Sequence, residues 1–319
     1  MVFDFSAVVA PFRMQPGLRR IAPGVSQLTP NRLDDRGLRE KLSVLSRHRE
    51  QAFVVAPTFD PAGAIAALAA HAATEHPEAF VRHADGALSL PTDDAFEAPH
   101  LGWSLRDGRF EGSGPAEIGA CLQALPPAWR LTGLLSLAFA EDFAILDASD
   151  GRIPWLAVCL PSRWMPSDKV GRAFAEVHAP VADNEVLIAA SDHLVRLVTG
   201  GDRWERFVWT LTDSPTLDRH PARSAPSRWD ASLSADELAA ATFFRSERQT
   251  FIPVASTRLA IFTIHVEVRS LQSVVRSAAD ASRLEAALAT MSPAVLDYRG
   301  LAPARDRLLT WLAAMAATA

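Results

Sequence analysis

Apolar residues recur at two different spacings along the chain, which divides it into helical ends and a strand-rich centre. Residues 34–50 alternate charged residues with Leu and Val at helical spacing, and residues 61–75 are rich in Ala after a proline. Each stretch predicts a helix. From about residue 270 onward the chain is rich in Ala, Leu and Arg, and Pro293 and Pro303 are placed to start or break helices. We therefore expect the C-terminal part to be helical.

Strand patterns are concentrated in the second half of the centre. Residues 205–212 alternate polar and apolar side chains, as do residues 243–252 and 258–268 on either side of a loop that contains Pro253. The last two stretches predict a long antiparallel hairpin. Residues 87–115 are instead rich in Gly, Pro, Asp and Ser, so we expect loops with short extended pieces there.

The stretches between these groups carry mixed signals. Residues 131–147 and 153–160 are apolar runs that suit a buried hairpin, although the first run is long enough to include a helix. Residues 167–178 open with Ser-Asp and end before Ala-Pro, which predicts a short helix with a cap and a proline stop. Helices, then a mixed central sheet with a short helix inside it, then helices again indicate an α+β fold. No sharp boundary divides residues 1–319, so we predict a single domain.

Composition limits the classes of partner and cofactor. The net charge of −5, with both signs interspersed, gives no reason to expect nucleic acid or an anionic membrane as a partner. Cys121 and Cys159 are the two cysteines and form no CxxC pair, which argues against a disulfide framework, a structural zinc or an iron–sulfur cluster in this chain. The N-terminal segment has no basic run before its short apolar piece, and the longest apolar stretch stops at Glu141-Asp142. We therefore expect no secretory signal, no membrane helix and a cytoplasmic location.

Several common catalytic motifs are missing from the sequence. GxGxxG and GxxxxGK[ST] are both absent, so nucleotide binding by a glycine-rich loop is not supported. GxSxG and HExxH are also absent, which removes the support for an α/β-hydrolase or a zinc hydrolase. His71 lies within the predicted helix 61–75, where a histidine on a helix face is the ordinary interpretation.

Two short segments combine residue types that suit chemistry. Glu141 and Asp142 follow an apolar run, where two adjacent carboxylates suit acid–base work if buried, although spacing alone favours a turn between strands. Residues 159–181 place Trp164, Lys169 and His178 around one short helix. A histidine at a helix end can ligate a metal through a neutral ring nitrogen. It can equally balance the helix dipole, and spacing alone favours that interpretation.

A third segment, FFRSERQTFI, places consecutive polar residues inside the predicted hairpin. Because side chains alternate along a strand, the segment presents two polar faces: Arg245, Glu247 and Gln249 on one, and Ser246, Arg248 and Thr250 on the other. Burying these groups requires mutual pairing or a polar ligand. The alternative is an edge strand with surface charge. The flanking phenylalanines favour a functional role.

Taken in order, these segments resemble a known family. PFRMQPGL, EDFAIL, PSRWMPSDKVGRAFAEVHAPV, RFVW, RSERQTF and AIFTI follow the order of the haem-dependent oxidative N-demethylase family, which includes the haem subunit of dimethylamine monooxygenase. Its members carry P-S-x-W, K-x-G and I-H-x-P-V-P, then R-x-N-W and R-x-E-R-Q-T-L. The resemblance spans nearly the whole chain.

The resemblance implies a fold and an activity. It implies a PAS-like antiparallel core, about residues 125–270, with short helices, flanked by N- and C-terminal helices and binding haem b. The implied reaction is the O2-dependent oxidation of a small secondary amine such as dimethylamine to methylamine and formaldehyde. The electrons come from NADPH through separate flavin and iron–sulfur subunits, and tetrahydrofolate is a further cofactor.

The resemblance also implies roles for individual residues. His178 falls on the histidine of the family's I-H-x-P-V run and is the expected iron ligand. The other expected cofactor-binding residues are Trp164, Lys169, Arg206, Trp209 and Arg245. The strand residues expected near the reaction are Glu247, Arg248 and Gln249. In this scheme arginines pair the haem propionates or polarise bound O2, and Glu247 holds a protonated amine.

Some positions depart from the family pattern. Val208 stands where the family has Asn, Ala182 replaces the last proline of P-V-P, and Phe251 begins FIPV in place of the usual leucine segment. His265 replaces an arginine, and it is either a second haem-side histidine or an ordinary sheet-face one. The changes in polarity point to a changed substrate. Three alternatives stay open: an oxidative demethylase, a non-catalytic haem PAS-like sensor or ligand-binding module, and a divergent member that has lost haem.

Overall fold

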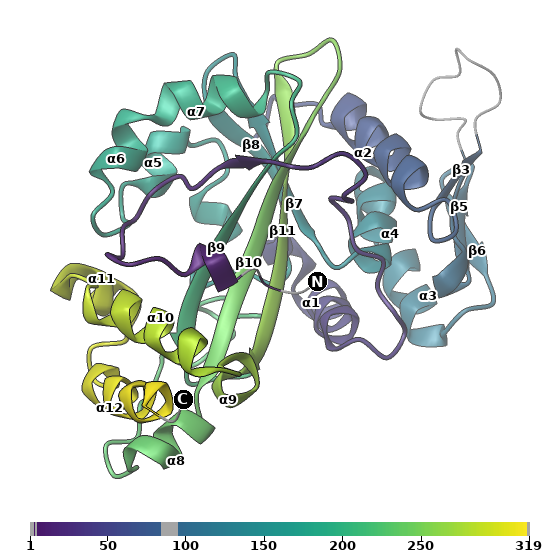
Figure 1. The fold of residues 1–319 in the computed structure, drawn as a ribbon. Helices are drawn as coiled ribbons and strands as arrows, with labels where there is room; N and C mark the ends of the chain where they lie inside the picture. The colour runs from purple at the N-terminus through teal and green to yellow at the C-terminus, as the bar shows by residue number, and fades with distance from the viewer. Residues whose placement is uncertain (1–2, 4, 84–94, 318–319) are drawn as a thin grey trace.

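A seven-stranded antiparallel sheet forms the centre of the molecule (Figure 1). The computed structural model describes residues 3, 5–83 and 95–317. Within them the sheet has the order β1-β9-β10-β11-β7-β8-β2. In that order the strands are Arg19–Arg20, Trp204–Thr212, Phe243–Pro253, Leu259–Ser270, Asp142–Asp147, Arg152–Ala157 and Phe53–Val55. The sheet and its helices confirm the predicted α+β class.

The long hairpin predicted at residues 243–252 and 258–268 is present as β10 and β11. Its register pairs Glu247 with Val266 and Arg248 with His265. Strand β9, predicted at residues 205–212, lies on the other side of β10 and pairs Val208 with Glu247. These three strands are therefore confirmed at the places where the alternating pattern predicted them.

Helices from the first half of the chain cover one face of the sheet. They are α1, α2 and α4, at Arg36–Ala52, Ala62–Glu75 and Arg130–Ala138, and α3, at Ala116–Gln123, packs against α1 and α4. The first two confirm the helices predicted at residues 34–50 and 61–75. Helix α4 decides the alternative left open for residues 131–147, because its apolar residues are buried as a helix and only β7 is extended. Strand β8 then completes the β7–β8 hairpin.

A second, smaller sheet lies beyond these helices. Its strands β3, β4, β5 and β6 are Val81–His83, Ala95–Ala98, Trp103–Arg106 and Arg109–Gly112, in that order. Extended pieces were predicted within residues 87–115, and the part from residue 95 onward confirms them. Residues 87–94 of that stretch lie outside the described part of the chain.

Three short helices lie on the opposite side of the main sheet from α1, α2 and α4 (Figure 1). They are α5, α6 and α7, at Phe174–His178, Glu185–Ala189 and Ser191–Val198. The helix predicted at residues 167–178 is therefore wrong at its start. A 3-10 turn at Pro166–Asp168 is followed by Gly171 at φ +74°, a conformation that breaks a right-handed helix.

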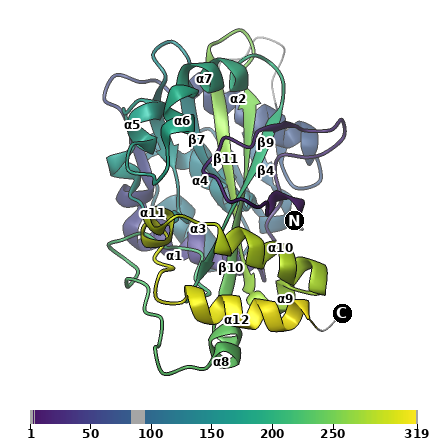
Figure 2. The same ribbon diagram turned by 60° about the vertical axis from the view of Figure 1, so that its left-hand side comes forward.

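The C-terminal part is helical, as predicted, and packs at one end of the sheet (Figure 2). Helices α9, α10, α11 and α12 are Leu271–Val274, Ala278–Ala289, Pro293–Tyr298 and Arg305–Ala316, and the earlier helix α8, at Ala235–Ala240, packs against α12. Pro293 occupies the first turn of α11, where a missing N–H costs nothing. Within the described residues, no helix is both long and apolar enough to cross a membrane.

Candidate functional site

A cavity of about 360 Å³ lies between the main sheet and the helices α5 to α7. This volume is within the usual range for small-molecule sites. Met14, Pro16 and Leu18 of the N-terminal segment line it, as do Tyr298 and Arg299 at the end of α11. Most of the remaining wall is apolar, so a bound molecule would be largely shielded from water.

All but one of the predicted site residues line this cavity. Those that do are Trp164, Lys169, His178, Arg206, Trp209, Arg245, Glu247 and Gln249. The register of the sheet explains the grouping of the strand residues, since Arg206 on β9 lies directly opposite Gln249 on β10. Glu247 and Arg206 therefore share one face as diagonal neighbours.

His178 is the last residue of α5 and faces the cavity. Its Nδ1 donates a hydrogen bond to the carbonyl oxygen of Phe174 at 2.8 Å, and the two rings lie 4.1 Å apart. Burial, with help from the charges of Arg206 and Lys169, lowers the pKa of His178 to about 4. The imidazole is therefore neutral at pH 7, and Nε2 keeps its lone pair with no hydrogen-bond partner among the described residues.

Lys169 and Arg206 surround the same end of the cavity. The Nζ of Lys169 donates to the carbonyl oxygen of Val177 at 2.8 Å, which fixes the carboxyl end of α5 and hence the position of His178. Burial lowers the pKa of Arg206 to about 10, against the opposing charge of Glu247. The buried Nε of Arg206 has no hydrogen-bond partner in the described structure, so this guanidinium suits an anionic ligand.

Glu247 is held in place by a set of polar contacts. The hydroxyl of Ser162 donates to its Oε1, and Nε2 of Gln249 donates to its Oε2 at 2.7 Å. Arg245 supports this arrangement, because its Nε donates to Ser162 Oγ at 2.8 Å and its Nη1 donates to the Leu217 carbonyl oxygen at 2.9 Å. The N–H groups of Arg245 thus bond to other protein atoms, and through Ser162 they orient the carboxylate of Glu247.

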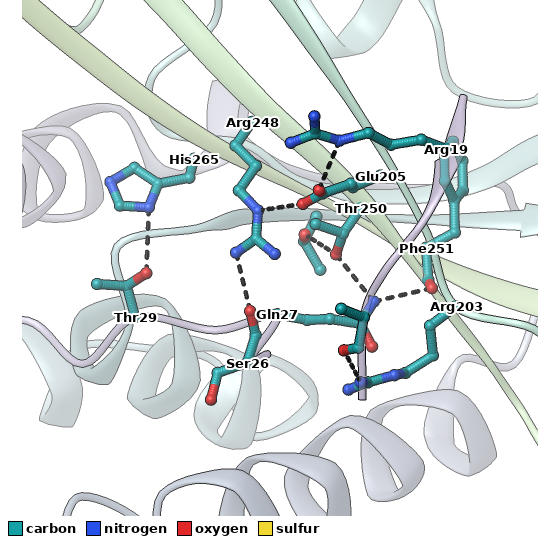
Figure 3. A network of polar contacts seen from close by, with 12 residues as sticks. Arg19, Ser26, Gln27, Thr29, Arg203, Glu205, Arg248, Thr250, Phe251 and His265 are labelled. Atoms are coloured by element: carbon teal, nitrogen blue, oxygen red, sulfur yellow. Dashed lines mark hydrogen bonds and ion pairs between the residues drawn. The ribbon is translucent and has the colours of Figure 1, made fainter. Parts of the chain in front are cut away.

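Arg248 is the exception among the predicted residues. It lies on the opposite face of β10, where its Nε donates to Glu205 Oε2 and its Nη1 to the Ser26 carbonyl oxygen, each at 2.8 Å (Figure 3). Arg19 pairs with the same carboxylate at 2.9 Å. The alternation of side chains along a strand places Arg248 away from the cavity, so we correct its expected position and leave it out of the site.

His265 lies beside Arg248 on that opposite face (Figure 3). Its Nδ1 is 3.0 Å from Glu141 Oε1 and 3.2 Å from Thr29 Oγ1. It is therefore a sheet-face histidine with local partners, and the alternative of a second haem-side histidine has no support. Glu141 and Asp142 are both buried beside the fully buried Lys41, whose Nζ is 3.2 Å from Asp142 Oδ1. These carboxylates take part in structural ion pairs outside the cavity.

Residues from distant parts of the chain complete the wall and were not predicted. Tyr298 and Arg299 come from α11, and Nη1 of Arg299 donates to the Trp209 carbonyl oxygen at 2.6 Å while its guanidinium lies 4.5 Å from the ring centre of Phe12. Two signals could have found this region. Tyr298 is the only tyrosine of the sequence, and the PFRMQPGL segment that matches the family contains Met14.

A comparison with protein families adds an independent finding to this geometry. The family model described as "Haem-dependent oxidative N-demethylase, alpha subunit-like" matches residues 35–309. This match covers most of the chain and confirms the resemblance drawn from the sequence. It includes the strands and the short helix α5 that carry His178, Arg206 and Glu247.

Proposed function

This chain belongs to the haem-dependent oxidative N-demethylase family, alpha subunit-like, and we propose that it binds haem b in the cavity and takes part in the oxidation of a small secondary amine. The observation that carries the proposal is the state of His178: a neutral imidazole, fixed through Nδ1, with Nε2 free at the cavity wall. A histidine that ligates a metal commonly donates a hydrogen bond from its other ring nitrogen to a carbonyl oxygen, which fixes the orientation of the ring.

The donor set suits haem better than a metal ion held by side chains alone. Among the described residues, no group of three or more His, Cys, Asp or Glu side chains could hold a metal. A haem iron needs only one protein ligand, because the porphyrin supplies the others. The apolar wall suits the macrocycle, and the unpartnered Nε of Arg206 suits a propionate.

The chain's own residues have distinct proposed roles around this group. Haem, when bound, supplies the iron centre at which O2 is activated. Glu247 accepts hydrogen bonds from the protonated amine, while Ser162 and Gln249 keep its two oxygens oriented. Lys169 holds the end of α5 in position, and Phe174 packs against the His178 ring and excludes water from it.

We also propose the wider arrangement that the family suggests. Residues from about 125 to 270 form a PAS-like core within a single domain. The description of the family as alpha subunit-like supports the presence of partner subunits. In this proposal NADPH-derived electrons reach the haem through separate flavin and iron–sulfur subunits.

A haem titration of the purified protein tests the proposal directly. We expect a Soret band and binding at a one-to-one ratio. His178→Ala should shift this band and weaken haem binding by at least about tenfold, because the axial ligand is lost. His193→Ala, at an exposed position on α7, is the matched control and should behave like the wild type. Wild-type protein without a Soret band after reconstitution would overturn the proposal.

Turnover separates the demethylase from the non-catalytic haem module. Haem-loaded protein is supplied with dimethylamine, O2, NADPH and a reductase, and formaldehyde release is measured. Formaldehyde formation that depends on His178 supports the enzyme. Haem binding without any formaldehyde from secondary N-methylamines supports the sensor or ligand-binding module.

A further inference from the structure

Two further arginines, Arg163 and Arg219, line the cavity and have no part in the site described above. Nη2 of Arg163 donates to the hydroxyl of Ser227, and Nη2 of Arg219 donates to the same oxygen at 3.4 Å. Their backbones are also joined, since Arg163 N donates to the Arg219 carbonyl oxygen at 3.1 Å. Two guanidinium groups thus converge on one hydroxyl at the cavity wall.

The charges of this cluster are not balanced by the protein. Asp213 is the nearby carboxylate, 3.6 Å from Arg219 Nη2, and it also accepts a hydrogen bond from Ser227 Oγ at 2.9 Å. Two cations therefore face one anion. The side chain of Arg219 is only 6% exposed, and its Nε has no partner in the described structure. The buried Arg219 thus shares its one carboxylate with the exposed Arg163, and one added carboxylate would neutralise the cluster.

The backbone of Arg163 gives a second, independent sign. Its φ is +65°, in the left-handed region that residues with a side chain rarely adopt. Holding a residue there costs about 1 kcal/mol or more, and such strain is concentrated at ligand sites. The strained backbone belongs to the residue whose guanidinium group shares the Ser227 hydroxyl with that of Arg219, although the two like charges repel each other.

The cavity as a whole is strongly basic, although the chain carries a net charge of −5. Glu247 is the single acidic residue among the described residues of the lining. The basic residues of the lining are Arg163, Lys169, Arg206, Arg219, Arg245 and Arg299. The two propionates of a haem would neutralise only part of this excess. A simple dialkylammonium ion would therefore meet net repulsion, whereas an amine that also carries an anionic group would not.

Ser162 connects the two charged regions. Its hydroxyl donates to Glu247 Oε1, and the next residue in the chain is Arg163. Ser162 also forms a backbone bridge with Arg219. Ser162 thus lies between two kinds of group. On one side is the Glu247 carboxylate, which accepts hydrogen bonds, and on the other are Arg163 and Arg219, which donate them. An N-methyl α-amino acid has the matching order, with a secondary ammonium and a carboxylate on the same carbon.

We propose that Arg163, Arg219 and Ser227 form a carboxylate-binding subsite, and that the substrate is a secondary N-methylamine that carries a carboxylate. This inference rests on the proposed function. The reaction converts N-methylglycine, O2, two electrons and two protons into glycine, formaldehyde and water, with NADPH as the reductant. A methyl C–H bond is oxidised to C–O, O2 is reduced, and the C–N bond breaks as formaldehyde leaves, while the nitrogen retains the electron pair and takes a proton.

Calorimetric titration tests the subsite without requiring turnover. Haem-loaded protein is titrated with N-methylglycine, with its methyl ester and with dimethylamine. We expect N-methylglycine to bind at least about tenfold more tightly than the other two, because its carboxylate forms charge-assisted hydrogen bonds. Equal affinity for all three compounds would overturn the proposal.

Two variants assign the preference to the arginines. Arg219→Gln and Arg163→Gln should each reduce the preference for N-methylglycine by about tenfold and leave dimethylamine binding unchanged. Arg163 is an exposed residue of the lining, so its variant serves if Arg219→Gln fails to fold. Arg228→Gln removes the same charge beside Ser227, from an exposed residue outside the lining, and should keep the full preference. A preference retained in both cavity variants would overturn the assignment.

A haem titration of the same variants separates the two sources of a carboxylate. Unchanged haem affinity in Arg163→Gln and Arg219→Gln supports a subsite for the substrate. Weakened haem affinity with an unchanged ligand preference would show that a propionate occupies the arginines, which overturns the substrate assignment. Failure of the proposed function has a different signature, because wild-type protein would then show no Soret band at all.

Discussion

Glu141 shows how a single buried charge is held in this protein. It is 1% exposed, its Oε1 lies 3.0 Å from His265 Nδ1, and its Oε2 accepts a hydrogen bond from Thr29 N at 2.9 Å. Burial by itself raises the pKa of Glu141. The hydrogen bond and charge of His265, the Thr29 amide and the charge of Lys41 together outweigh burial, so the net pKa is lowered. The folded state therefore favours the ionised carboxylate.

This lowered pKa predicts an acid-dependent loss of stability. Glu141→Gln should reduce the free energy of unfolding by about 3 kcal/mol at pH 7, because it leaves polar partners unmatched in the interior. The ionised carboxylate contributes fully to the free energy of unfolding above its ordinary pKa of 4.5. This contribution is lost as the pH falls through the lowered pKa of the folded state. Urea unfolding of wild type and variant should therefore differ most at neutral pH and converge in acid.

An exposed carboxylate provides the control for Glu141. Glu117 lies on the exposed face of α3, and Glu117→Gln should change the unfolding free energy by no more than about 0.5 kcal/mol. A difference between wild type and Glu141→Gln that stays constant from pH 7 to pH 3 would contradict the assigned role of the ionised carboxylate.

At the scale of elements, the short helix α5 depends on the turn before it. Gly171 has φ +74° and separates the 3-10 turn from α5, and an added Cβ at this position would meet no atom within 4 Å. Gly171→Ala should therefore destabilise the fold through backbone strain alone, by about 1 kcal/mol. We also expect weaker haem binding, because the turn sets the position of His178. Thermal unfolding and a haem titration measure the two effects.

A helical glycine gives the opposite expectation and serves as the control. Gly63 lies in α2, and an added Cβ there also meets no atom within 4 Å. Gly63→Ala should leave haem binding unchanged and raise stability by a few tenths of a kcal/mol up to about 1 kcal/mol. If both substitutions changed the stability in the same direction, backbone conformation would not be the cause of the change at Gly171.

The sequence pattern correctly located the elements in which apolar and polar positions repeat regularly from one end to the other. Strands β9, β10 and β11 have a clear alternation along their length, and the amphipathic α1 has one polar side. The start of α5 was wrong, because Ser-Asp resembles a helix cap and local pattern does not reveal that Gly171 adopts a positive φ. The helix–strand boundary near residue 139 was open for a similar reason, since both elements there are mostly apolar and buried.

Site residues were predictable where motif and strand alternation agree. His178 and Glu247 line the cavity, and alternation alone separates Arg248 from Glu247 onto the far face. Tyr298 and Arg219 were missed, because their approach to the sheet depends on how distant segments pack. Short-range spacing carries no information about such contacts.

At the scale of the whole molecule, haem should stabilise the fold by mass action. At a free haem concentration of one hundred times its dissociation constant, the expected gain is about 2.7 kcal/mol. For a chain of this size this corresponds to a rise in Tm on the order of 4 °C. Differential scanning calorimetry with and without haem measures the shift. His178→Ala should show a smaller shift at the same haem concentration, and an equal shift would show that haem binds elsewhere.

The walls of the cavity have a consequence for how the protein is made. Met14 and Leu18 form one part of the lining, and Tyr298 and Arg299 form another, so residues from both ends of the chain enclose the same space. During synthesis the ribosome releases the N-terminal wall first and the α11 wall last. If haem binds in this cavity as proposed, the chain can enclose it only after α11 has emerged, so insertion of the group would follow the synthesis of α11.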